Sequence, residues 1–121
     1  MTMPAYQNTA TEAQMLQALT DAIELHGGAW YRVRDSRGQM VTGMPDLLCF
    51  CPVSPGGYDL GLYGFEVKTM NDRIRPGQKE FLDMLNRVTF CRGEIVRAGR
   101  LRDGECTIDD ALELIAKGPR A

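Results

Sequence analysis

The sequence predicts an α/β fold in which helices flank a central mixed sheet. Short apolar runs bounded by Gly and Pro favour strands, and apolar residues at helical spacing favour helices. The predicted order of helix, three strands, helix, strand and last helix is typical of layered α/β domains. The chain of 121 residues fits a single domain, 1–121, whose start at 1–9 we expect to be flexible. The strands are predicted at 29–34, 47–51, 62–68 and 94–98, and the helices at 11–26, 76–88 and 108–117.

The first helix is predicted from Thr11 to His26. Thr11 and Gln14 have the spacing of a capping box, and the pair Gly27-Gly28 ends the helix. Its buried stripe is expected to consist of Ala13, Leu16, Leu19, Ala22 and Ile23.

The segment 29–34 has the alternation of a half-buried strand. Trp30, Arg32 and Arg34 share one side of this strand, so we expect the two arginines to face solvent or a ligand. Residues 35–38 have the composition of a turn.

Two buried strands on either side of the Pro/Gly-rich loop 52–60 bring three ionisable side chains together. Asp46 opens the first strand, and Glu66 and Lys68 end the second. Antiparallel pairing places these strand ends side by side, and the alternation of side chains puts Glu66 and Lys68 on one face. We expect the loop itself to be flexible or to touch a substrate.

Two carboxylates and a lysine at one end of a sheet suit phosphodiester chemistry. Carboxylate oxygens are ligands for hard divalent cations such as Mg²⁺. A lysine supplies positive charge beside an attacking water or a scissile phosphate. For Glu66 and Lys68 alone, an ordinary solvated ion pair is the competing interpretation.

The later elements add one further candidate residue. Pro76 suits the first position of the helix 76–88, and Gln78 falls in its first turn, where free N–H groups favour an anion. A plain surface glutamine is the alternative. Thr107 is expected to cap the last helix after a turn at 102–104. The buried stripe of the helix 76–88 is expected to be Phe81, Leu82, Leu85 and Val88.

The net charge of −2 is unusual for a nucleic-acid-binding protein, but the basic residues are clustered and mostly arginine. Arginine suits phosphate because its planar fork donates two hydrogen bonds at once. We therefore expect contacts to a nucleic-acid backbone from three clusters: Arg32, Arg34 and Arg37; Arg73, Arg75 and Lys79; and Arg97, Arg100 and Arg102.

Neither cysteines nor membrane segments suggest another class of protein. Cys49, Cys51, Cys91 and Cys106 lack the paired spacing of zinc sites, so we expect no structural zinc and no disulfides. Cys49 and Cys51 fall on one face of a strand, as buried thiols do. No apolar run approaches the roughly 20 residues of a membrane span. We expect a soluble, cytoplasmic protein of bacterial or phage type with no membrane partner.

The arrangement Pro45-Asp46, about twenty residues and then Glu66-Val67-Lys68 resembles the signature of the PD-(D/E)XK nuclease superfamily. The surroundings resemble its VRR-Nuc branch, the virus-type replication-repair nucleases. This resemblance runs from Thr11 to Ala98 and includes Glu12, Gly43 and Gln78. It implies a restriction-endonuclease-like αβββαβ core, to which this chain adds a C-terminal helix.

The resemblance also implies a divalent-metal-dependent DNA endonuclease. Asp46, Glu66 and the backbone carbonyl of Val67 would hold Mg²⁺ or Mn²⁺, with Glu12 as a further candidate ligand if it is not simply a partner of the helix dipole. Lys68 would act on the attacking water, and Gln78 would position water or phosphate.

Stand-alone members of the resembled family imply a homodimer that cuts branched DNA, such as four-way (Holliday) junctions in DNA repair. A nicking, flap or restriction-type nuclease on the same core remains an alternative, because a fold does not fix a substrate. Outside enzymes, the alternatives are a nucleic-acid-binding module without turnover and, more remotely, a redox or zinc protein built on the cysteines.

Overall fold

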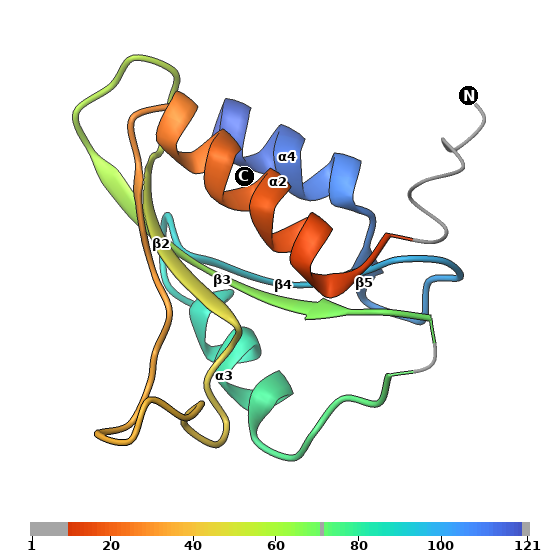
Figure 1. Ribbon diagram of the computed structural model, residues 1–121. Coiled ribbons are helices and arrows are strands. Elements are labelled where there is room, and N and C mark those ends of the chain that lie inside the picture. Colours follow the sequence, from red (N-terminus) through yellow and green to blue (C-terminus); the bar gives the residue numbers. More distant parts are fainter. Residues whose placement is uncertain (1–9, 71, 120–121) are drawn as a thin grey trace.

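The computed structural model describes residues 10–70 and 72–119, and in them the chain forms a mixed five-stranded sheet with helices on both faces (Figure 1). The first strand pairs antiparallel with the second, and the second with the third. The third pairs parallel with the fourth, and the fourth with the fifth. This is the predicted fold class, which is confirmed. The residues 1–9, predicted to be flexible, lie outside the described ranges. In spatial order the strands are β1 (Ala29–Tyr31), β2 (Leu47–Pro52), β3 (Leu60–Lys68), β4 (Arg92–Arg97) and β5 (Glu105–Cys106).

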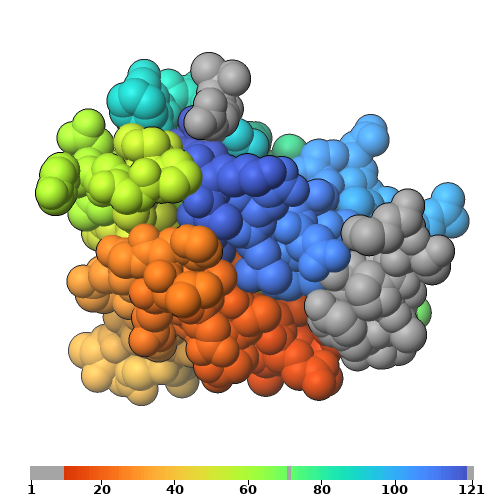
Figure 2. Space-filling model, turned by 90° about the horizontal axis from the view of Figure 1, so that it is seen from above, coloured from red at the N-terminus to blue at the C-terminus, as the bar shows by residue number. Residues whose placement is uncertain are grey.

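Two helices cover one face of the sheet and a third covers part of the other. Helices α2 (Glu12–Leu25) and α4 (Ile108–Lys117) lie side by side on the first face, as Figure 2 shows from above. Helix α3 (Gln78–Leu85) packs on β3 and β4 from the opposite face (Figure 1). None of the helices within the described ranges is long and apolar enough to cross a bilayer.

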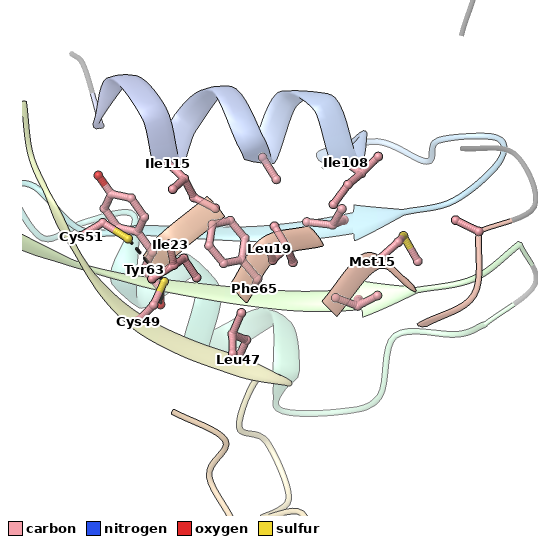
Figure 3. Packing of buried hydrophobic residues seen from close by; sticks show 14 of the residues in the cluster. Met15, Leu19, Ile23, Leu47, Cys49, Cys51, Tyr63, Phe65, Ile108 and Ile115 are labelled. Atoms are coloured by element: carbon pink, nitrogen blue, oxygen red, sulfur yellow. Dashed lines mark hydrogen bonds between the residues drawn. The ribbon is translucent and has the colours of Figure 1, made fainter. Parts of the chain in front are cut away.

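The core lies between the sheet and the pair α2 and α4 (Figure 3). Leu19 and Ile23 from α2 and Ile115 from α4 are fully or almost fully buried against the rings of Tyr63 and Phe65 from β3. The two rings meet edge to face with centroids 6.3 Å apart. Burial of one such apolar side chain contributes roughly 1.5–3 kcal/mol. This packing fixes β3, the strand that carries Glu66 and Lys68.

Helix α2 has the predicted capping box, but its buried stripe differs in part. The Thr11 hydroxyl accepts the Gln14 N–H at 3.1 Å, and the Thr11 N–H donates to the Gln14 side chain at 2.9 Å. Because α2 packs against both the sheet and α4, its buried face turns towards Met15 and Thr20, which were not predicted, and away from Ala13, which is exposed. Leu19 and Ile23 are buried as predicted, and Leu16 and Ala22 are half-buried.

The prediction of a half-buried strand over 29–34 was wrong in length and in burial. β1 ends at Tyr31, and all three of its residues are exposed. Tyr31 pairs with Leu48, so only Arg32 would still face a residue of β2, and the residues after Arg32 have no strand to pair with. Beyond the strand, Arg34 forms an isolated bridge with Met40, which closes the predicted turn at 35–38.

Helix α3 is shorter than predicted. It begins at Gln78 rather than Pro76, because Gly77 adopts a left-handed conformation (φ 89°) that α-helical backbone does not allow. Leu82 and Leu85 are buried as predicted, and Phe81 is half-buried. The helix ends before Val88, which is 48% exposed and not part of the buried stripe.

The C-terminal part contains a strand that was not predicted. β4 begins at Arg92, two residues before the predicted start, and ends at Arg97 rather than Ala98. β5 adds two residues in parallel to Ile95 and Val96, which is too short to leave an alternating pattern in the sequence. The turn at 102–104 and the last helix, capped by Thr107 and extending over 108–117, agree with their predicted positions.

The thiols of Cys49 and Cys51 are buried on one face of β2, as predicted for a pair of small apolar residues, with their sulfurs 3.8 Å apart. Cys91 and Cys106 are half-buried, and all four cysteines are free.

Candidate active site

Asp46 and Glu66 meet where β2 begins and β3 ends. The antiparallel register pairs Leu47 with Phe65, so the residues just before and just after this pair face each other. The Asp46 N–H donates to Glu66 Oε1 at 3.0 Å, and the Val67 N–H donates to Asp46 Oδ2 at 2.9 Å. These two hydrogen bonds lock the carboxyl groups beside each other.

Lys68 lies on the same face of β3 as Glu66, two residues further on. Its Nζ is 3.5 Å from Glu66 Oε2, and the two side chains are only 9% and 1% exposed. A solvated surface ion pair is therefore not what these residues form. A buried ion pair is stable only when its surroundings compensate for the desolvation of both charges. Buried ionisable groups of this kind are common at functional sites.

The surroundings of Glu66 disfavour the charged form of its carboxyl group. Burial and then the neighbouring Asp46 carboxyl raise the pKa of Glu66 to about 8, against a smaller opposing effect of Lys68. Two carboxyl groups in one buried place resist carrying two negative charges. One further positive charge, either a proton or a cation, would therefore stabilise the pair.

A cavity of about 360 Å³ gives access to these residues. Besides Asp46, Glu66 and Lys68, its lining includes Glu12 from the first turn of α2. Burial, and next the charge of Asp46, raise the pKa of Glu12, so this carboxyl belongs to the same electrostatic system. Glu12 therefore lies at the cavity. It also lies in the first turn of α2, where the helix dipole favours an acidic side chain.

Gln78 also lines the cavity and is not a surface glutamine. The residue is 7% exposed, and its side-chain oxygen accepts the Arg75 N–H at 2.9 Å. The first residue of α3 is thereby tied to the segment that precedes it.

Two glycines let the approach to Asp46 pack closely against the start of α3. Gly43 and Gly77 both have positive φ angles, of 84° and 89°. A Cβ atom on Gly77 would lie 3.2 Å from the Gly43 Cα. Only glycine combines this backbone conformation with such a close approach, which gives Gly43 a structural role next to the site.

The oxygen donors at the site suit a hard divalent cation. Within 10–70 and 72–119, no three His, Cys, Asp or Glu side chains are grouped closely enough to form a complete metal site. Mg²⁺, however, commonly takes only one or two protein carboxylates and keeps several waters. The buried pair of Asp46 and Glu66, with the Val67 main chain and Glu12 at the same cavity, fits that pattern.

The predicted DNA-contacting residues lie in different surroundings. Arg73 and Arg75 line the cavity. Arg34, Arg37, Lys79, Arg100 and Arg102 are exposed away from it, and Lys79 pairs with Asp83 at 3.7 Å. Arg32 is half-buried, and its Nε is shielded from solvent without a hydrogen-bond partner among the described residues.

For Arg97 the prediction of a DNA contact was wrong. Its side chain is 0% exposed because the guanidinium is bound by Glu105 and by backbone carbonyls. A group enclosed in this way cannot reach a phosphate without leaving these partners.

Two residues of the cavity wall, Asp72 and Met40, were not predicted. The Asp72 carboxylate accepts hydrogen bonds from the Thr69 N–H and hydroxyl, at 2.9 and 2.7 Å. The spacing Thr69-x-x-Asp72 is a turn signal that could have drawn attention to this acid. By contrast, the loop between β2 and β3 lies at the far end of the hairpin from Asp46 and Glu66 and does not line this cavity.

Comparison with known proteins adds to this geometry. The family profile of the VRR-NUC domain matches residues 3–97, which is most of the chain. A solved structure described as a VRR_NUC domain has 20% sequence identity and a TM-score of 0.51, with 86% of this chain and 92% of that chain covered, and so has the same fold. No curated protein sequence gives a significant match. The chain therefore belongs to the VRR-NUC family of nuclease-type domains.

Proposed function

We propose that this VRR-NUC domain is a divalent-metal-dependent endonuclease that hydrolyses phosphodiester bonds in DNA. The observation that carries the proposal is the buried contact of Asp46 and Glu66 beside Lys68, at a cavity lined by further acidic and basic groups. Family membership supports the same chemistry.

In this proposal Asp46, Glu66 and the carbonyl of Val67 hold Mg²⁺, or Mn²⁺ in its place, and Glu12 is the further acid of the site. A cation held there supplies Lewis acidity, which makes an attacking water easier to deprotonate and offsets charge on the phosphate. The raised pKa of Glu66 supports this assignment, because the pair needs a compensating positive charge.

Lys68 orients the attacking water and stabilises the pentacovalent phosphate as an ammonium, or takes the proton of the water as a neutral amine. Its ammonium is held 3.5 Å from Glu66 in a buried position, where a charge acts more strongly than in water. Gln78 positions water or phosphate. Arg73 and Arg75, which line the cavity, contact the scissile region of the backbone, while Arg32, Arg34, Arg37 and Lys79 serve the flanking DNA.

The test is a cleavage assay on labelled linear, flap and four-way-junction DNA with Mg²⁺, Mn²⁺ or chelator. We expect cleavage only with metal, and losses of at least about 100-fold in Asp46→Asn, Glu66→Gln and Lys68→Met. Asp59→Asn is the matched control, because this exposed acid lies at the far end of the β2–β3 hairpin.

Wild-type rates in Glu66→Gln would contradict the assignment of the site. Protein that binds junctions in Ca²⁺ but cuts nothing in Mg²⁺ or Mn²⁺ would identify a binding module without turnover. Equal cleavage of linear and branched DNA would favour a nicking or restriction-type enzyme over a junction nuclease.

Junction cleavage by a homodimer is the finer part of the proposal, and an uncovered area of the sheet supports it. Because α3 packs on β3 and β4, aromatic and apolar residues of the first strands stay exposed beside it. Tyr31 and Phe50 are 55% and 43% exposed, with their rings edge to face at 6.4 Å. Light scattering should give a dimer mass for the wild type and a monomer mass for Phe50→Glu.

A further inference from the structure

Arg97 is a fully buried charged residue at the end of β4. Its side chain is 0% exposed, and it does not line the cavity of the candidate active site. It nevertheless lies beside that site, because the parallel register pairs Arg97 with Lys68, and the Ala98 N–H donates to the Lys68 carbonyl at 3.0 Å. A buried cation next to the proposed chemistry, but outside its cavity, requires an explanation of its own.

One edge of the guanidinium binds Glu105 of β5. Nε donates to Oε1 at 2.6 Å, and Nη2 donates to Oε2 at 2.8 Å, so the pair is bidentate. Glu105 Oε1 also accepts the Arg102 N–H at 2.8 Å. This acid is therefore fixed in place and fixes the plane of the guanidinium.

The other edge of the guanidinium holds the segment that follows Lys68. Nη1 donates to the carbonyls of Thr69 and Asp72, at 2.9 and 2.8 Å. The same two residues are joined to each other, since the Asp72 N–H donates to the Thr69 carbonyl at 3.1 Å and the Asp72 carboxylate accepts from Thr69. Asp72 is also part of the cavity wall.

A guanidinium is the side chain that can make both sets of contacts. Its rigid plane carries donors on several edges, whereas a lysine has one tetrahedral ammonium. Removal of the guanidinium would take one hydrogen bond from each carbonyl and would leave the buried Glu105 carboxylate without its counter-charge, which is costly. Arg97 thus links the end of β3 and one wall of the cavity to the pair β4 and β5.

We propose that Arg97, oriented by Glu105, is a positioning residue for the nuclease reaction. It holds the Thr69 and Asp72 carbonyls so that Lys68 and Asp72 keep the geometry in which the phosphodiester is attacked. This inference rests on the proposed function of the domain. Arg97 itself touches neither the DNA nor the metal, and it acts through the backbone after Lys68.

The experiment compares cleavage kinetics of Arg97→Met and Arg97→Lys with those of the wild type. We expect kcat to fall about 10- to 100-fold in Arg97→Met, because small displacements of reacting groups lower the rate by such factors. KM should stay within about twofold of the wild-type value. Arg97→Lys should recover part of the loss, because an ammonium can still serve one of the carbonyls. The matched control is Arg92→Met, since Arg92 forms an Arg–Glu pair with Glu94 at the other end of the same strand.

Circular dichroism and thermal melting establish that each variant is folded when it is assayed. A folded Arg97→Met protein with wild-type kcat would overturn the positioning role, and so would a change confined to KM, which would assign Arg97 to DNA binding. If Arg97→Met does not fold, Glu105→Gln decides in the same way, because it keeps the guanidinium but loosens its orientation. A wild-type protein without any cleavage overturns the proposed function instead, so the two failures are distinguishable.

Discussion

Gly43 and Gly77 let the segment that carries Asp46 touch the start of the helix that carries Gln78. The two backbones approach so closely that a Cβ on Gly77 would lie 3.2 Å from the Gly43 Cα. The two glycines therefore set the distance between the parts of the cavity wall that carry Asp46 and Gln78. Close packing at this point is needed for the geometry of the proposed site.

Gly77→Ala should lower the stability of the protein more than Gly38→Ala does. Both glycines have positive φ angles, 89° and 78°, so an alanine at either place costs roughly 1–2 kcal/mol in backbone strain. Only at Gly77 does the added Cβ meet a neighbour, whereas nothing lies within 4 Å at Gly38. Urea denaturation measures both free energies of unfolding, and equal values would mean that the Gly43 contact yields at no cost.

At the level of single residues, the sequence was informative where strand geometry controls position. The meeting of Asp46 with Glu66 follows from alternation and antiparallel pairing, and both can be inferred from residue order. Asp72 was missed because it follows β3 in a polar link with no periodicity. Arg97 was misassigned because its partner Glu105 lies in a strand too short to be recognised.

Among the elements, β4 and β5 are joined by a buried ion pair whose strength depends on pH. Burial alone would raise the pKa of Glu105, but hydrogen bonds from Arg97 and from the Arg102 N–H outweigh it and leave the pKa lowered. A carboxyl with a lowered folded-state pKa stabilises the fold above its unfolded pKa of about 4.3 and loses this contribution as the pH falls through the folded value.

Glu105→Gln should therefore destabilise the protein at pH 7 and much less at acid pH. Removal of one member of a buried pair typically costs roughly 3–5 kcal/mol, because it leaves the other charge uncompensated. The difference in unfolding free energy between wild type and variant, measured in urea from pH 7 down to pH 3, should narrow below about pH 4.3. A difference that stays constant over this range would exclude the ion pair as its origin.

How well an element could be predicted depended on its local signals. The bounds of α4 were predicted correctly because Thr107 and Asp110 form a capping box that marks its start. The start of α3 was misplaced because Pro76 suits the first position of a helix. Gly77 has a left-handed conformation that keeps Pro76 out of the helix, and this conformation goes with the packing of Gly77 against Gly43, which lies far away in the sequence. β1 was predicted too long because its end is set by the start of a partner strand, which lies elsewhere in the sequence.

In the molecule as a whole, α2 and α4 act as one layer over the sheet (Figure 2). Ile108, Ala111 and Ile115 of α4 are buried in the same core as Leu19 and Ile23 of α2. The C-terminal helix is therefore part of the hydrophobic core rather than an addition to a finished domain.

A chain shortened after Ala98 should lose cooperative folding. It would lack both Glu105, the partner of the buried Arg97, and the three buried residues of α4. A chain ending at Pro119 is the matched control, because it keeps every described element. Urea unfolding followed by circular dichroism distinguishes them: we expect a sigmoidal transition only for the longer chain, and a two-state transition in the shorter one would contradict this role of the C-terminal part.

The ion pair of Arg97 and Glu105 spans the end of the region that the family profile matches, since that region stops at residue 97. The guanidinium belongs to the matched region, and its counter-charge lies beyond the end of that region. In a chimaera with another member of the family, the two residues would have to be transferred together. A crossover placed between them would separate the buried guanidinium from its counter-charge.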